Sequence, residues 1–357
     1  SALQHDSFGT LLQHHLTHDL QLDMSTSVTL FNASTAAPSS SPSSSPSSSS
    51  SASSLLSNNG RTAVYNCMID ETGEMVTAVA DMDILERELT PDRIRSLLSS
   101  MVARNEMLNQ SHGAGAPPRT ILLFVDGNVA AQTLKAICQF TTEHNSDRNK
   151  SRQLQFSVFF EPTSVAKCVR PIQANCLSQI MFMKPNEDEL TAMVDAILQS
   201  TSSSSSSTSA NQMSVYDRLK LLILNGAHHI FLTRGKYGVI HAYCRTHQHE
   251  QKVFYDHYPA IPVPAERRVN VTGCGDNFAS GLIYGISNGY SIQDAIHMGL
   301  RASFLTIQCE QSVHPDLNVK FITTRQQEED YEEHHELMED DGEDGTGQFS
   351  GSLSEDL

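Results

Sequence analysis

Short apolar runs alternate with segments of helical periodicity over the second half of the chain. Residues 120–128 (TILLFVDGN), 154–162 (LQFSVFFEP) and 179–186 (QIMFMKPN) have the length and composition of buried strands. Amphipathic helical stretches follow the first run and the third, at 129–144 and 187–198. This alternation is typical of a mostly parallel sheet with helices on both faces. The pattern therefore predicts an α/β fold.

Three further strands and two helices complete the predicted order. The strands are expected at 228–235, 238–244 and 252–260, one helix from Asp276, and another within 291–309. In sheets of this kind, ligands bind beyond the carboxyl ends of the strands. Four polar residues fall at such ends: Asp126, Glu161, Asn186 and Thr233.

The first half of the chain reads differently. The β-rich runs at 62–70 and 75–81 are joined by ETGE, which predicts a hairpin. A helix is expected over 90–108, with Thr90 as N-cap and Pro91 at its first position.

Low-complexity segments interrupt this pattern. Residues 3–20 have helical apolar spacing, but the serine-rich stretches at about 37–58 and 200–211 have too few apolar residues to bury enough surface to become ordered. Each lies between patterned segments, so we expect inserted surface loops and no domain boundary. The acidic run within residues 326–357 predicts a solvated, disordered tail.

Composition narrows the functional classes. The formal charge of −17 lies largely in the acidic tail, and the rest of the chain is only mildly acidic. This charge does not favour a nucleic-acid-binding surface, so a small-molecule partner is expected. The seven cysteines are scattered without a CxxC pair, which indicates reduced thiols and no zinc site. No apolar run reaches 18 residues and no secretory leader is evident, so we expect no membrane span and a cytoplasmic location.

The segment NVTGCGDNFASGLI (270–283) carries the most specific chemistry. Gly273 and Gly275 allow the main chain to approach a ligand closely, and the helix behind them presents unpaired N–H groups. Together these features predict a phosphate site. Asp276 at its rim is placed to accept a proton from a hydroxyl that attacks phosphorus. The alternative is that Asp276 only caps the helix.

This segment resembles the C-terminal signature of the ribokinase-like (PfkB-type) carbohydrate and nucleoside kinases. KPNEDEL (184–190) resembles that family's proline-asparagine-x-x-glutamate motif, and LTRGKYGVI (232–240) resembles its nucleotide-phosphate strand-turn-strand. The three motifs occur in the family's order. The resemblance implies a three-layer α/β/α kinase domain over residues 1–325, with a small β-lid hairpin at about 61–83.

The resemblance also implies a role for each matching residue. Asp276 would be the catalytic base, and the amides of Gly273, Cys274 and Gly275 would hold the transferred phosphoryl group. Asn186 and Glu189 would organise Mg²⁺ and the ATP phosphates through water. The triphosphate would contact Thr233 and Gly235, beside a turn kept tight by Gly238. ATP and Mg²⁺ are the implied cofactors, and a monovalent cation stays open.

Simpler interpretations of these residues stay open beside the functional ones. Glu189 could be an ordinary first-turn carboxylate. Gly235 and Gly238 could merely close a hairpin. Cys274 replaces the small Ala, Gly or Ser usual between the two glycines, and it could be a packed residue or an oxidisable thiol. No GxxxxGK[ST] sequence occurs, which excludes a P-loop kinase at the level of motifs.

Within the family, residues 61–91, FVDGN and FFEPTSVAK are similar to the pseudouridine kinases. This similarity implies ATP-dependent phosphorylation of a nucleoside 5′-hydroxyl, with pseudouridine as the favoured acceptor. Another sugar substrate is an alternative. Asp81, Asp126 and Glu161 are candidates for the substrate side, or strand-end turn formers and structural carboxylates.

The resemblance also predicts a missing part. HDSFGTLLQHHL (5–16) resembles the stretch that follows the family's first strand and its sugar-binding glycine-glycine-x-x-x-asparagine segment. The chain is therefore expected to lack these elements, which makes a truncated, non-catalytic nucleotide-binding member the second alternative. A homodimer, or fusion to a glycosidase domain in a longer product, is the assembly left open.

Overall fold

The computed structural model describes most of the patterned sequence. The described residues are 2–3, 28–29, 62–70, 75–112, 119–147, 154–201, 209–247 and 250–324. The first serine-rich stretch and the acidic tail lie outside them, as do most of the predicted helix at 3–20 and part of the second serine-rich stretch.

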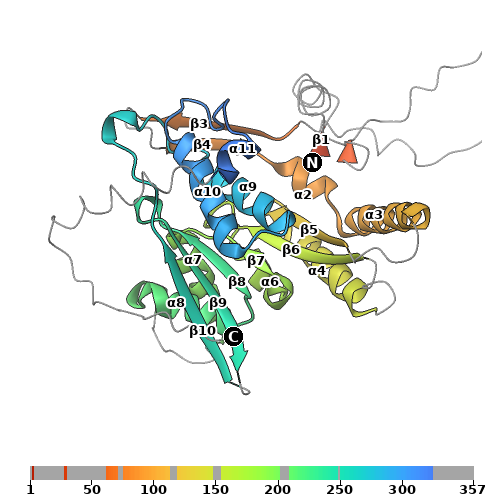
Figure 1. The fold of residues 1–357 in the computed structure, drawn as a ribbon. Coiled ribbons are helices and arrows are strands. Elements are labelled where there is room, and N and C mark those ends of the chain that lie inside the picture. Colours follow the sequence, from red (N-terminus) through yellow and green to blue (C-terminus); the bar gives the residue numbers. More distant parts are fainter. Residues whose placement is uncertain are drawn as a thin grey trace, which may run out of the picture.

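A six-stranded sheet forms the centre of the molecule (Figure 1), with the order β10–β9–β8–β7–β6–β5. Strands β5 to β8 are parallel, whereas β9 and β10 are antiparallel to their neighbours. The strands are β5 (Arg119–Asp126), β6 (Leu154–Glu161), β7 (Phe182–Met183), β8 (His229–Thr233), β9 (Val239–His247) and β10 (Glu250–Tyr258). The expected α/β fold with a mostly parallel sheet is confirmed.

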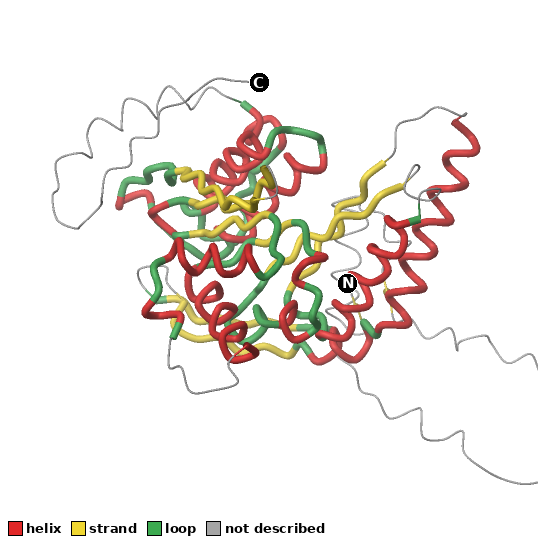
Figure 2. Tube along the Cα trace, turned by 90° about the horizontal axis from the view of Figure 1, so that it is seen from below, coloured by secondary structure: helices red, strands yellow, loops and turns green. Residues whose placement is uncertain are grey.

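Helices cover both faces of the sheet. Successive side chains along a strand point to opposite faces, so one strand can pack against both helix layers. On β8, Ile230 and Leu232 belong to the core cluster that includes residues of α4, α7 and α8, while Phe231 packs with α9 and α10. In Figure 1, α9 and α10 lie in front of the sheet, and Figure 2 shows helices on either side of the strands. The helices are α4 (Ala131–Ser146), α6 (Arg170–Gln173), α7 (Glu187–Thr201), α8 (Val215–Leu224), α9 (Cys274–Ser287) and α10 (Ile292–Thr306).

Serine side chains begin two of these helices. The hydroxyl of Ser214 accepts the amide of Asp217 at the start of α8, and Ser291 accepts the amide of Asp294 at the start of α10. Each bond satisfies a first-turn N–H group that has no partner inside the helix. These helix starts are therefore encoded locally.

A second, two-stranded sheet lies apart from the six-stranded sheet, at the top of Figure 1. It is the antiparallel hairpin of β3 (Val64–Ile69) and β4 (Met75–Asp81), which the sequence predicted. Its apolar side chains Tyr65, Met68 and Val79 are exposed. The chain then continues into α2 (Asp83–Glu88) and α3 (Pro91–His112), while β1 (Ala2–Leu3) pairs with β2 (Val28–Thr29).

A row of stacked rings crosses the sheet face that carries α9 and α10. Phe231, His241 and Tyr243 stack in sequence, with centroids 4.9 and 4.6 Å apart. His229 also joins the row, because its Nδ1 lies 2.9 Å from Nε2 of His241. Burial lowers the pKa of His229 to about 4 and that of His241 to about 3, so both rings are neutral near pH 7.

No helix among the described residues is both long enough and apolar enough to span a membrane.

Candidate active site

The four strand-end residues identified in the sequence meet at one edge of the sheet. Asp126 and Glu161 are the last residues of the neighbouring strands β5 and β6 and are register partners. Asn186 follows β7 and forms a bridge with Thr233, the last residue of β8. The parallel arrangement therefore brings residues more than 100 positions apart to a common edge.

The glycine turn before α9 has the conformation that only glycine adopts readily. Gly273 is the N-cap of the helix, with φ of 85°, and a Cβ there would lie 2.3 Å from the carbonyl oxygen of Ser312. The helix begins at Cys274, two residues before the predicted start. Asp276 is therefore the third helical residue, and the interpretation of Asp276 as the N-cap is wrong.

Two buried asparagines hold this turn in place. Asn270 accepts the amide of Thr272 at 2.8 Å and donates to the carbonyl of Glu310 at 3.1 Å. Asn277 donates to the carbonyls of Gly273 and Ser312, at 2.8 and 2.7 Å. Neither asparagine is a predicted site residue, although both lie within the signature segment. Their amides fix the turn against the segment after α10.

The amides of the turn are only partly available to a ligand. The N–H of Cys274 donates to the carbonyl of Val271 at 3.2 Å, so one of the three amides predicted to hold a phosphoryl group is engaged. The N–H groups of Gly275 and Asp276 belong to the first turn of α9, where the helix supplies no acceptor. These amides and the positive end of the helix dipole make the turn a candidate anion site.

The thiol of Cys274 lies near two backbone carbonyls. Its sulfur lies 3.9 Å from the carbonyl oxygens of Asn270 and Ser303. Burial, and to a lesser extent the charge of Asp276, raises the pKa of the Cys274 thiol to about 11. The thiol is protonated near neutral pH, which fits a packed residue better than an oxidisable one.

The carboxylate of Asp276 is exposed at the mouth of the turn. Among the described residues, none forms a hydrogen bond or ion pair with this carboxylate. The backbone carbonyl of Asp276 accepts the hydroxyl of Ser280 at 2.9 Å, one turn further along α9. The side chain is therefore available to a ligand at the anion site.

A buried ion pair lies directly beneath the turn. Nζ of Lys184 is 3.0 Å from Oε1 of Glu161, and the two residues are 5% and 9% exposed. A Cβ built on Gly275 would lie 3.5 Å from the same Nζ, which places the ammonium beside the α9 backbone. Lys184 is not among the predicted site residues. Its position within KPNEDEL, one residue after β7, was the available signal.

The environment of Glu161 disfavours its ionised form. Burial raises the pKa of its carboxyl to about 7; Lys184 opposes that rise, and the negative charges of Glu189 and Asp276 add to it. The charges of Glu189 and Asp276 thus act on Glu161 across the strand ends. Lys184 is the cation that acts on Glu161 within this group.

Asn186 and Glu189 form a reciprocal cap at the start of α7. The amide of Glu189 donates to Oδ1 of Asn186 at 2.8 Å, and the amide of Asn186 donates to Oε2 of Glu189 at 2.9 Å. This capping box is a structural role for both side chains. Burial raises the pKa of Glu189 above its usual value, although the bond from Asn186 opposes the rise.

The strand-turn-strand between β8 and β9 is tightly built. Thr233 donates its amide to the carbonyl of Pro185 at 2.9 Å, and the amide of Arg234 donates to the carbonyl of Gly238 at 2.8 Å. Gly238 has φ of 84°, and a Cβ there would lie 2.0 Å from the carbonyl oxygen of Tyr258. Gly235, at φ of 53°, has open space around it. Gly235 is therefore accessible, whereas Gly238 is a packing position.

The remaining sequence candidates are placed less directly. Both oxygens of Asp126 accept bonds from Asn128, from its amide at 3.0 Å and its side chain at 2.8 Å. Asn128 in turn accepts the ammonium of Lys167. Asp81 is the exposed last residue of β4. Among the described residues, no group of three or more His, Cys, Asp or Glu side chains could hold a metal ion directly.

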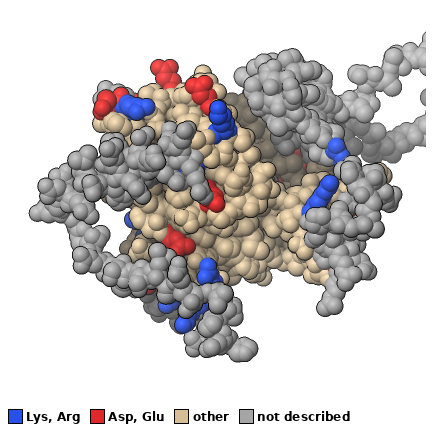
Figure 3. All heavy atoms as spheres, viewed as in Figure 1, with Lys and Arg blue, Asp and Glu red and all other residues tan. Residues whose placement is uncertain are grey.

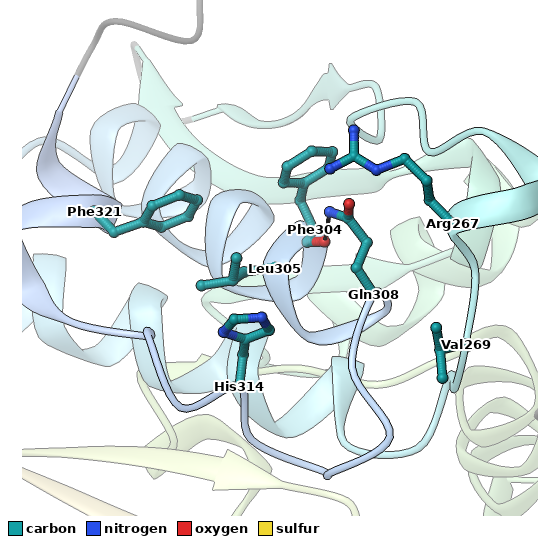
Figure 4. Close-up of a pocket in the computed structure, with 7 residues that line it drawn as sticks. All are labelled: Arg267, Val269, Phe304, Leu305, Gln308, His314 and Phe321. Carbon is teal, nitrogen blue, oxygen red and sulfur yellow. Dashed lines mark hydrogen bonds between the residues drawn. The ribbon is translucent and has the colours of Figure 1, made fainter.

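A pocket of about 470 Å³ opens between the loop before α9, the end of α10 and α11 (Val319–Thr323), as Figure 4 shows. Its lining residues are Arg267, Val269, Phe304, Leu305, Gln308, His314 and Phe321. None of the predicted site residues lines it. The face in Figure 3 carries scattered charged side chains among wide neutral areas of the described surface.

Comparisons with known proteins give an independent indication of the family. Residues 52–318 match the model of the pfkB family carbohydrate kinases. The pseudouridine kinase of Arabidopsis thaliana is 21% identical over 303 residues, which cover 73% of this chain and 72% of that protein. A pseudouridine-metabolizing bifunctional protein of Schizosaccharomyces pombe is 22% identical over 298 residues, covering 73% of this chain and 35% of that protein.

The fold is also found among solved structures. Arabidopsis thaliana ribokinase, complexed with ribose and ATP, superposes with a TM-score of 0.53 at 13% identity, over 88% of this chain and 77% of that one. This likeness shows a ribokinase-like fold. The match of the family model over most of the chain, with the glycine turn and Asp276 inside the matched range, shows that the chain belongs to the pfkB family of carbohydrate kinases.

Proposed function

We propose that this kinase transfers the γ-phosphoryl group of ATP to the 5′-hydroxyl of a nucleoside, and that pseudouridine is its preferred acceptor. The observation that carries the transfer chemistry is the available carboxylate of Asp276 on the first turn of α9, beside the anion site and Lys184. The preference for pseudouridine is supported by the two relatives named for pseudouridine and by the similarity of residues 61–91 to that subgroup.

The residues suit phosphoryl transfer because this reaction needs positioning and charge stabilisation more than covalent help. The α9 amides and the Lys184 ammonium would stabilise negative charge on the transferred group. Asp276 would accept the proton of the attacking hydroxyl, which turns that hydroxyl into a stronger nucleophile.

The donor set fits a magnesium ion that keeps most of its waters. Glu189 and Asn186 each spend one side-chain oxygen on the capping box, and no three-residue metal cluster exists among the described residues. Mg²⁺ commonly binds through one or two carboxylates together with substrate phosphates and water. Glu189 would hold that ion through water, and the ion would neutralise charge on the phosphates of ATP.

Substitution of Asp276 by Asn tests this proposal. We expect kcat to fall by about 10²- to 10⁴-fold with little change in ATP affinity, because the amide cannot accept the proton. ADP release should be measured with pseudouridine, uridine, adenosine and ribose, and the product checked for a 5′-phosphate.

Asp294→Asn is the matched control, since Asp294 holds the same position in the first turn of α10 and should leave kcat unchanged. Full activity of Asp276→Asn would contradict the assigned base. Turnover of ribose alone would indicate a sugar kinase instead of a nucleoside kinase.

A further inference from the structure

The Lys184–Glu161 pair lies in a buried, electropositive environment, where a cation needs a nearby anion to be stable. Its ammonium sits beside Gly275, at the positive end of the α9 dipole, and both partners are removed from water. Burial of an ion pair costs free energy that the attraction between the partners often fails to recover. The pair is thus poorly explained as a device for stability. An anion that arrives at the α9 turn would explain the buried ammonium.

The backbone around Glu161 is held in a demanding conformation. Thr163, two residues further on, has φ of 71°, which is rare for a β-branched residue. Its hydroxyl accepts the amide of Gly127 at 2.9 Å and donates to the carbonyl of Glu161 at 3.2 Å. The amide of Gly127 also donates to that carbonyl, at 2.7 Å. These bonds hold the ends of β5 and β6 together and fix the backbone from which the Glu161 side chain extends.

The carboxylate of Glu161 has one task among the described residues. Oε1 pairs with Lys184, and Oε2 is buried without a hydrogen-bond partner. A buried carboxylate that served only the fold would be expected to have both oxygens bonded. The neighbouring acids offer no alternative partner, since Glu189 and Asp276 repel it and Asp126 is bonded to Asn128.

We propose that Glu161 is a positioning residue that holds the Lys184 ammonium against the α9 turn, so that the terminal phosphate of the nucleotide meets a preformed cation. The inference rests on the proposed function, because it assumes that a nucleotide phosphate occupies the turn. Glu161 acts through Lys184 and touches no reacting atom. Preorganised charge of this kind needs no rearrangement during the reaction.

The test is a double-mutant cycle with Glu161→Gln, Lys184→Met and the combined variant. If Glu161 acts through Lys184, Glu161→Gln should lower kcat about tenfold or more with KM for ATP changed less than threefold. Lys184→Met should lower kcat about 10²- to 10³-fold. The combined variant should have the kcat of Lys184→Met, and Glu161→Asp should recover part of the loss. Independent roles would instead multiply the two losses.

ATP affinity, measured by calorimetry, gives a second readout. Because Lys184→Met removes the cation that opposes the raised pKa of Glu161, the measurement is made at about pH 9, where a buried glutamate can ionise. There Lys184→Met leaves an unpaired carboxylate beside the phosphates, so the combined variant should bind ATP more tightly than Lys184→Met alone. Wild-type kcat in Glu161→Gln, multiplied losses, or no recovery of ATP affinity would each overturn the proposal. Glu88→Gln, at a surface ion pair with Arg93, is the control and should change neither quantity.

The two proposals can fail separately. If the wild-type protein binds ATP but phosphorylates none of the acceptors, the proposed function fails, and the recovery of ATP affinity still decides the role of Glu161. Thermal melts of every variant separate loss of folding from loss of function, and Glu161→Asp provides the test if Glu161→Gln does not fold.

Discussion

The turn between β8 and β9 contains two glycines with positive φ that should respond very differently to the same substitution. Gly238→Ala would place a Cβ 2.0 Å from the carbonyl oxygen of Tyr258 and 2.6 Å from the amide nitrogen of Ala260. Both contacts are with backbone atoms, which cannot swing aside as a flexible side chain can. Gly235→Ala places its Cβ in open space.

The expected magnitudes follow from these contacts. Gly235→Ala should cost about 1–2 kcal/mol, the penalty of a non-glycine residue in the left-handed region. Gly238→Ala carries a backbone penalty of about 1–3 kcal/mol and a displacement of packed backbone worth about 1–3 kcal/mol more. With the middle of each range, Gly238→Ala should be less stable than Gly235→Ala by about 2.5 kcal/mol. Replacing Gly by Ala also lowers the conformational entropy of the unfolded chain, but this effect is the same in the two variants and cancels in their difference.

Urea unfolding of both variants, with constant m-values, measures this difference. Gly238→Ala should also lose ATP affinity, because its backbone amide and carbonyl close the turn that presents Gly235. Equal destabilisation of the two variants, or a larger loss in Gly235→Ala, would refute the reasoning.

Three further predictions concern stability. Asn186→Ala should lower the free energy of unfolding by about 1 kcal/mol, because it removes half of the capping box. Glu189→Gln should lower it less, because the new amide oxygen still accepts the amide of Asn186. Urea unfolding without Mg²⁺ measures both changes. The lowered pKa of His241 means that the folded state binds fewer protons, so stability should fall as pH drops below about 6.5. His241→Phe should lose less stability than the wild type between pH 7 and 5, and an equal loss would contradict the buried neutral ring. The pH dependence of stability that Glu161 contributes has the opposite sign. Its raised pKa means that the folded state binds more protons, so its contribution to stability should fall as pH rises from about 4.5 to 7, and Glu161→Gln should remove that slope.

Local sequence signals predicted the elements well where one segment determines its own conformation. The hairpin β3–β4 followed from its alternating runs, and the strand ends at Asp126 and Glu161 followed from the polar residues that close apolar runs. The start of α9 was misplaced by two residues, because Gly273 caps the helix through its backbone conformation and uses no side chain. Asp and Gly are both favoured N-cap residues, so residue type alone does not decide between Gly273 and Asp276.

The sequence by itself determined the fold class and located the glycine turn and the candidate base, because each depends on residues close together in the chain. Only the tertiary structure decided which partners surround them. Lys184 reaches Gly275, and Glu161 reaches Lys184, because parallel strands end at one edge of the sheet and α9 begins there. Charge interactions depend on distance in space and on burial, and neither quantity can be read from separation along the chain.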